Sequence, residues 1–76
     1  MKDLLYTIVK GLVENPDAVN IEETQDDDGT VVFRLHVAQE DMGRVIGKQG
    51  RIAKAIRTVM RAAANRSDSR IAVEID

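Results

Sequence analysis

The chain has 76 residues, which allows one small domain with a core near the lower limit for independent folding. Its 43% hydrophobic and 32% charged residues are typical of a globular protein, and the lack of cysteine excludes disulfides and the commonest zinc ligand. The sequence has no signal peptide and no apolar run of about 18 residues, so we expect a cytoplasmic protein. Because it has no cysteine and a single histidine, we also expect no metal or cofactor.

The net charge of −2 hides an uneven distribution of charged residues along the chain. Residues 42–66 contain seven basic residues and no acidic one, whereas residues 1–41 contain ten acidic and three basic residues. A local basic surface can bind a polyanion while the acidic remainder discourages non-specific association. The charge pattern therefore predicts a polyanion-binding region in the second half of the chain.

The first predicted element is an amphipathic helix. Its apolar residues recur with helical spacing at Leu4, Leu5, Ile8, Val9, Leu12 and Val13. We expect Asp3 to cap the start of this helix and Asn15-Pro16 to end it, because the residue before a proline disfavours the helical conformation.

Two strands joined by a hairpin are predicted next. Val19 and Ile21 alternate with polar residues, as in a half-buried strand. The stretch Asp26-Asp27-Asp28-Gly29 is a turn signal, because Asp-Gly between such runs is typical of a hairpin. Residues 31–37 then alternate more clearly and predict a second strand with Phe33 on its apolar side.

Helical spacing returns after Gln39. A short helix of about two turns contains Gly43, which costs roughly 1 kcal/mol relative to alanine. A longer helix ends near Asn65, and its predicted buried stripe consists of Ile52, Ile56, Val59, Met60 and Ala63. Ile71, Val73 and Ile75 alternate as a third strand. The order α-β-β-α-α-β predicts one α+β domain over residues 1–76, with a three-stranded sheet and helices packed on one face.

The segment Gly47-Lys48-Gln49-Gly50, here called the glycine turn, lies between the two later helices. Glycine lets bare backbone approach a ligand, and the free N–H groups of the next helix face the same place, which suits a phosphate. Glycines between helices often serve only as a cap, and basic residues on a helix are usually solvated. The coincidence of turn, helix start and acid-free basic stretch nevertheless favours polyanion binding.

The residues from Val45 to Ile56 resemble the signature of the K homology (KH) domain, Val-Ile-Gly-x-x-Gly-x-x-Ile-x-x-Ile. The element order resembles the prokaryotic type II form over essentially the whole chain. This resemblance implies binding of single-stranded RNA, with the glycine turn gripping the backbone of about four nucleotides. It implies an RNA-binding site made of Arg44, Val45, Ile46, Gly47, Lys48, Gln49, Gly50, Arg51 and Lys54. Arg34 and His36 are further candidates for a groove that reads the bases.

The expected affinity is low. Tyr6 and Phe33 are the only aromatic residues, and Phe33 is assigned to the core. Base stacking, worth about 1–3 kcal/mol per base, is therefore mostly missing. We expect weakly sequence-selective binding, roughly micromolar or poorer at physiological salt.

Enzymatic alternatives find little support in the sequence. A P-loop needs four residues between its glycines, whereas three separate Gly43 from Gly47, and Gln49 stands where magnesium binding requires Ser or Thr. The Asp26–Asp28 run suits a solvated turn better than a metal site. His36 is better explained as an exposed strand residue than as a catalytic base. With no convincing nucleophile–base pair, we predict that the protein is not an enzyme.

The serious alternative is a protein-interaction module in which RNA binding is secondary. A marginal core favours dimerisation, and joining two weak clamps raises the effective affinity. The resemblance also extends to small free-standing bacterial KH proteins. It implies a homodimer, a heterodimer with a larger KH-containing bacterial protein, or both. It further implies a post-transcriptional regulator or RNA chaperone linked to cell elongation or division.

Overall fold

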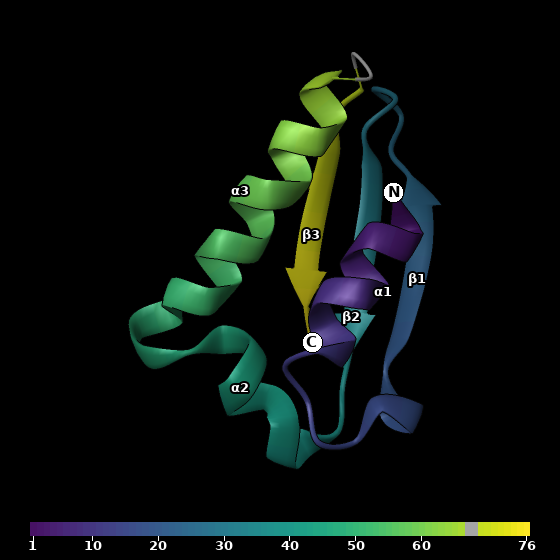
Figure 1. Cartoon of the computed structure of the whole chain (residues 1–76). Coiled ribbons are helices and arrows are strands. Elements are labelled where there is room, and N and C mark those ends of the chain that lie inside the picture. Colours follow the sequence, from purple (N-terminus) through teal and green to yellow (C-terminus); the bar gives the residue numbers. More distant parts are fainter. Residues whose placement is uncertain (67–68) are drawn as a thin grey trace.

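The computed structural model describes residues 1–66 and 69–76 and has the predicted order of elements. These elements are α1 (Lys2–Lys10), β1 (Asn20–Gln25), β2 (Val31–His36), α2 (Met42–Ile46), α3 (Arg51–Arg66) and β3 (Ile71–Ile75). Short 3-10 turns at Pro16–Ala18, Gln39–Asp41 and Lys48–Gly50 connect them. Figure 1 shows the helices on one face of the sheet, so the predicted α+β fold is confirmed. No helix in the described ranges is long and apolar enough to cross a membrane.

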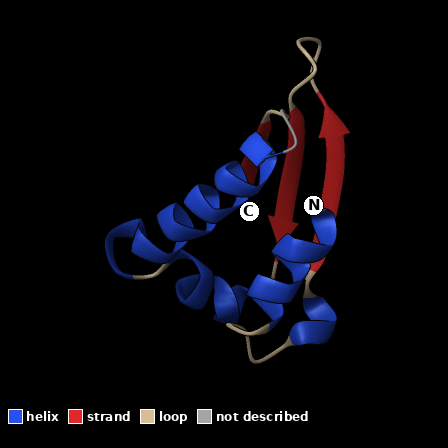
Figure 2. Ribbon diagram, turned by 45° about the horizontal axis from the view of Figure 1, so that its top comes forward, coloured by secondary structure: helices blue, strands red, loops and turns tan. Residues whose placement is uncertain are grey.

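The sheet has the strand order β1-β2-β3. The antiparallel pair β1–β2 places Ile21 opposite Leu35, and the parallel pair β2–β3 places Phe33 opposite Val73. A parallel pair needs a long crossover connection, which α2 and α3 provide. Figure 2 shows this crossover passing over the helix-covered face. Among the strands of the described ranges, β3 is an edge strand with β2 as its one neighbour.

The predicted hairpin turn is confirmed. The N–H of Asp26 donates to the carbonyl of Thr30 at 2.8 Å, and the N–H of Gly29 donates to the carbonyl of Asp26 at 3.0 Å. Gly29 has a φ of 89°, which explains why glycine ends the acidic run.

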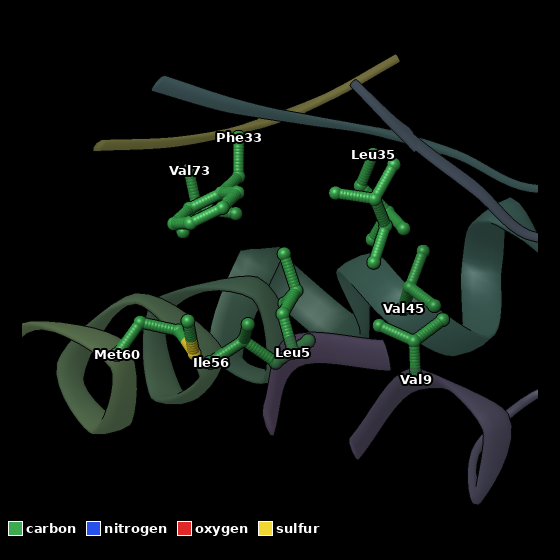
Figure 3. Packing of buried hydrophobic residues seen from close by; sticks show 9 residues of the cluster. Leu5, Val9, Phe33, Leu35, Val45, Ile56, Met60 and Val73 are labelled. Atoms are coloured by element: carbon green, nitrogen blue, oxygen red, sulfur yellow. The ribbon is translucent and has the colours of Figure 1, made fainter. Parts of the chain in front are cut away.

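The core lies between the sheet and the three helices. Figure 3 shows Phe33 and Val73 pointing from the sheet toward Met60 and Ile56, while Leu35 lies over Val45 and Val9. The buried cluster consists of Leu5, Val9, Ile21, Phe33, Leu35, Val45, Ile56, Met60 and Val73. Burying each of the larger side chains stabilises the fold by about 1.5–3 kcal/mol. Because the core is small, it depends on the contributions of both the sheet and the helices.

The predicted limits of the first helix are wrong. Met1 is the N-cap, no side chain caps the helix, and Asp3 lies within its first turn. The helix ends at Lys10, well before Asn15-Pro16, because Gly11 follows and disfavours continuation. Leu12 continues in a looser turn, where its N–H still donates to the carbonyl of Val9 at 2.9 Å.

The predicted buried stripe of the long helix is wrong at Val59 and holds only in part at Ile52 and Ala63, which are half-buried. Val59 is 47% exposed, while the buried residues are Ala53, Ile56, Met60 and Ala64. The sheet meets α3 slightly further round the helix than the sequence pattern indicated. As a result, Val59 faces the space beside α1 and not the core.

Candidate nucleic-acid interface

The backbone of the glycine turn requires glycine at its first position. Gly47 has φ 75° and ψ 176°, a region that only glycine adopts readily. A Cβ at this position would lie 2.6 Å from Cγ1 of Ile52. Gly50 also has a positive φ of 74°, but a Cβ there would have no heavy atom within 4 Å. Gly47 therefore permits both the bend and the close packing of the first turn of α3.

The tip of the turn is exposed. Lys48 and Gln49 both point to solvent, and the N–H of Gly50 closes the turn by donating to the carbonyl of Gly47 at 3.2 Å. Gln49 has a φ of 59°, an unusual conformation for a residue with a side chain. Its Oε1 accepts a hydrogen bond from Nη2 of Arg51 at 3.2 Å. The tip thus combines accessible backbone with a lysine, an amide and an arginine at the start of α3. Figure 1 shows the path of the chain from α2 through the turn into α3.

A buried carboxylate holds the segment that leads into this turn. Asp41 is 1% exposed and stands directly before α2. Its Oδ1 accepts the N–H of Glu14 at 3.1 Å, and its Oδ2 accepts the N–H and side-chain amide of Asn15, both at 3.0 Å. The segment after α1 is thereby fixed to the start of α2.

The pKa of Asp41 reflects these bonds. Burial by itself raises the pKa of the carboxyl group, but the donors from Glu14 and Asn15 and the nearby charge of Arg44 outweigh it and hold the pKa below its ordinary value. Asp41 is not among the residues predicted to act at the site. The only sequence signal for Asp41 is its position directly before a helix. An aspartate at such a position usually caps the helix that it precedes.

Two residues of the predicted RNA-binding set serve the fold. Val45 is fully buried in the core, so its side chain is not accessible to a ligand. The guanidinium of Arg44 pairs with the carboxylate of Glu14, and its Nε lies 3.7 Å from Oδ1 of Asp41. Arg44 therefore reinforces the junction before α2.

The two strand residues predicted for the groove lie away from the turn. Phe33 and Leu35 face the helices, so Arg34 and His36 face the opposite side of the sheet. Arg34 pairs with Glu74 at 3.1 Å. His36 lies 3.0 Å from a carboxylate oxygen of Glu22. Because that face is opposite to the glycine turn, the structure does not bring these two residues to the site.

The basic residues of α3 form a row along one flank of the helix. We call Lys54, Arg57 and Arg61 the basic row; their spacing places them on one side, and all three are exposed. Nε of Arg57 donates to the carbonyl of Val73 at 3.1 Å. The row therefore runs from the glycine turn toward the outer edge of β3, beside which α3 lies in Figure 1.

A hollow of about 240 Å³ opens between α3 and β3. We call it the edge hollow. The described residues that line it are Arg57, Arg61, Ile71, Ala72 and Val73. Arg57 and Arg61 are absent from the predicted site, although the helical spacing already separated them from the apolar stripe. The parallel pairing of β3 with β2 could not be read from that spacing, and this pairing puts the strand edge beside them.

Within the described ranges, no group of three or more His, Cys, Asp or Glu residues could hold a metal ion. The chemistry of the region is that of cations, amides and exposed backbone, which suits a sugar–phosphate strand.

Replacing Gly47 with alanine is expected to destabilise the domain more than the same change at Gly50. Both variants strain the backbone by about 1–3 kcal/mol. Only Gly47→Ala also drives a Cβ into Ile52. Urea unfolding of the two variants measures the difference, and equal losses would contradict the proposed packing constraint.

Replacing Asp41 with asparagine is expected to lower the urea midpoint at neutral pH and to change its pH dependence. The pKa of Asp41 is lowered in the folded state, so its stabilisation is present above the ordinary value near 4 and is lost as pH falls through the folded pKa. The difference between wild type and variant should therefore shrink on acidification. A difference that stays constant down to about pH 2 would refute this account.

Comparison with known proteins places the chain in a family. The family model described as "KhpA/KhpB, KH domain" matches residues 2–75. A protein named RNA-binding protein KhpA from Clostridium acetobutylicum is 56% identical over 75 residues, covering 99% of both chains. Proteins of the same name from Listeria monocytogenes and Chlamydia caviae are 52% and 44% identical; the alignments cover 99% of this chain and 97% and 95% of theirs.

Among solved structures, a variant of Era from Aquifex aeolicus has a similar fold, with a TM-score of 0.64 and 17% identity. The match covers 96% of this chain and 28% of the Era chain, and at this identity it shows the fold alone. The glycine turn, the sheet topology and the family match over nearly the whole length together show that this chain belongs to the KhpA/KhpB family of KH domains.

Proposed function

We propose that this protein binds single-stranded RNA, with the glycine turn gripping the sugar–phosphate backbone and the bases lying toward the edge hollow. The observation that carries the proposal is the exposed turn at residues 47–50, where accessible backbone meets the start of α3 and its basic row. The names of the relatives, which are RNA-binding proteins, support the same ligand.

Each residue of the turn has a separate role in this proposal. Gly47 and Gly50 let the RNA backbone approach, Lys48 supplies charge, and Gln49 donates an amide hydrogen bond. Arg51 and Lys54 flank the path of the strand, and the half-buried Ile46 offers an apolar surface beside it. Arg44 acts indirectly, by holding α2 through Glu14 and Asp41.

The expected binding strength follows from the same set of residues. If two or three phosphates are neutralised, the logarithm of the association constant falls with the logarithm of the salt concentration with a slope of about −2 for single-stranded RNA. Phe33 is 1% exposed, and Tyr6 lies on α1 with Lys10 over its ring, so neither provides a stacking platform at the turn. Affinity for a single domain should thus be micromolar or poorer, in the range of about 10⁻⁴–10⁻⁶ M for non-specific binding.

A clamp that holds backbone and reads few bases can act on many transcripts. We therefore assign the protein the role of a post-transcriptional regulator or RNA chaperone in the bacterial cytoplasm. A link to cell elongation or division is the physiological role that the family resemblance implies.

A second candidate function is self-association, or pairing with the larger KH-containing protein KhpB. The observation that favours it is an apolar groove of about 490 Å³ between α1 and α3. Its lining consists of Leu4, Ile8, Leu12, Arg51, Ile52, Ala55, Ile56 and Val59. Leu4 and Val59 remain 37% and 47% exposed there. Apart from Arg51, which the groove shares with the proposed RNA path, the groove lies on the opposite flank of α3 from the basic row. A partner that covers the part around Val59 would therefore leave the basic row open to RNA.

Replacing Lys48 and Gln49 together with aspartate is expected to abolish RNA binding, because two negative charges then face the phosphates. Fluorescence anisotropy with a single-stranded oligoribonucleotide measures the loss. Lys2→Asp, at the start of α1, is a control for added negative charge and should bind nearly as wild type does. Undiminished binding by the loop variant would place the RNA on another surface.

Replacing Val59 with glutamate is expected to convert a dimer into a monomer while leaving the RNA affinity of each domain unchanged. Burying the new charge in an interface without a partner costs several kcal/mol. Light scattering across a concentration series measures the oligomeric state, with Asn65→Glu on the same helix as control. A wild-type protein that is monomeric at every concentration, or a dimer that survives Val59→Glu, would exclude this interface.

A further inference from the structure

The outer edge of β1 carries free backbone groups at alternate residues. β1 ends the strand order, and among the described residues no strand lies beyond it. The N–H of Asp26 donates to the carbonyl of Thr30 and continues the antiparallel pairing with β2, so every second residue counted back from Asp26 turns its backbone groups toward β2. The N–H and carbonyl groups of Ile21, Glu23 and Gln25 therefore point away from β2, to the outer side of the sheet.

A hollow lies beside this edge, between α1 and the start of β1, and we call it the α1–β1 hollow. Its volume is about 240 Å³, and its described lining residues are Lys2, Asp3, Tyr6, Val19, Asn20 and Ile21. Tyr6 is 38% exposed, and exposed tyrosines often anchor protein interfaces. A chain that lies along β1 turns alternate side chains toward the helices, so one apolar side chain of that chain can enter the hollow.

The surface around the edge is acidic. Residues 11–33 contain seven acidic residues and no basic one. Five of the seven lie on β1 or in the hairpin turn that follows it, and all five are exposed: Glu22, Glu23, Asp26, Asp27 and Asp28. The nearby cations do not cancel this charge. Lys2 stands next to Asp3 in the hollow, and Nη2 of Arg70 donates to the backbone carbonyl of Asp28 at 2.9 Å, not to a carboxylate.

This charge restricts what the edge can bind. Two copies of the chain paired through their β1 edges would bring like charges together, and like charges on neighbouring strands are destabilising. Phosphate groups of RNA are repelled for the same reason. An extended polypeptide with basic side chains is attracted instead, and its main chain can bond to the free groups of the edge.

We propose that the outer edge of β1 docks an extended, lysine- or arginine-containing segment of a partner protein, which adds a strand to the sheet. One apolar side chain of the segment occupies the α1–β1 hollow, and its basic residues lie about five positions away, beside the hairpin turn. Figures 1 and 2 show the hairpin and the glycine turn, which joins α2 to α3, at different ends of the molecule. We therefore expect the segment and RNA to bind together.

The test uses the full chain and the synthetic peptide Leu-Thr-Val-Thr-Val-Lys-Lys-Lys, together with the peptide of reversed order, because a strand can add in either direction. We expect one of them to bind, and replacing its lysines with glutamates should weaken binding about tenfold or more. At saturation, hydrogen exchange of the Ile21, Glu23 and Gln25 amides should slow in NMR spectra. The amides of Glu22 and Thr24, which already face β2, should change little.

Two substitutions at one residue separate backbone from charge. Glu23→Pro removes an outward N–H and leaves the bonds to β2 in place, so it should weaken peptide binding about tenfold or more. Glu23→Gln keeps the N–H and loses the same charge, so it should weaken binding only about two- to threefold. A peptide with proline at its four middle positions keeps the charge and lacks the donors. It should bind about tenfold more weakly or worse, a result that does not depend on the folding of any variant.

The hollow is tested in the same way. Tyr6→Ala should weaken peptide binding about five- to tenfold, because the apolar anchor loses its aromatic wall. Thr7→Ala, one position further along α1 and outside the lining of the hollow, is the matched control and should bind as wild type does.

The outcomes overturn or support the inference separately from the proposed function. Failure of both basic peptides to bind overturns it and leaves the acidic residues only the task of keeping the edge from pairing. Binding that survives Glu23→Pro or the proline peptide overturns strand addition, and edge amides that shift with an oligouridine would assign the edge to RNA. Replacing Lys48 and Gln49 with aspartate should leave peptide binding unchanged, so loss of RNA binding and loss of peptide binding are distinguishable.

Discussion

The ionised carboxylate of Asp41 is the contact on which the geometry of the site depends. It is the one buried charged side chain among the described residues, and its partners come from the segment after α1. A five-residue helix such as α2 cannot hold its position by its own hydrogen bonds. Bonds from Glu14 and Asn15 on one side and core packing of Val45 on the other supply that support. The glycine turn can therefore project into solvent while its base stays fixed.

Helix α3 then divides the surface into separate regions. One side packs on the sheet through Ile56 and Met60. A second flank carries the basic row and borders the edge of β3. The remaining flank faces α1 with a half-exposed apolar surface around Val59. One helix thus carries a basic flank and an apolar flank on different sides, and Arg51 at its start is the residue that borders both.

This division offers a physical reason for combining a weak clamp with self-association. The site lacks aromatic stacking, and a few phosphate contacts give only modest affinity. Joining two such clamps through the apolar groove makes the second contact intramolecular and raises the apparent affinity without new contacts to RNA. The two candidate functions are therefore complementary.

The order of elements, the hairpin and the glycine turn were predictable from the sequence because each depends on local periodicity or on glycine at a defined place. The sequence also located the cations around the turn. Only the tertiary structure decided which of them line the edge hollow, because that depends on the parallel pairing of two strands about forty residues apart. For the same reason the exposure of Val59 and the role of Asp41 appeared only in the structure. Side chains in adjacent positions acquire different roles when distant elements meet one face of a helix and leave the next uncovered.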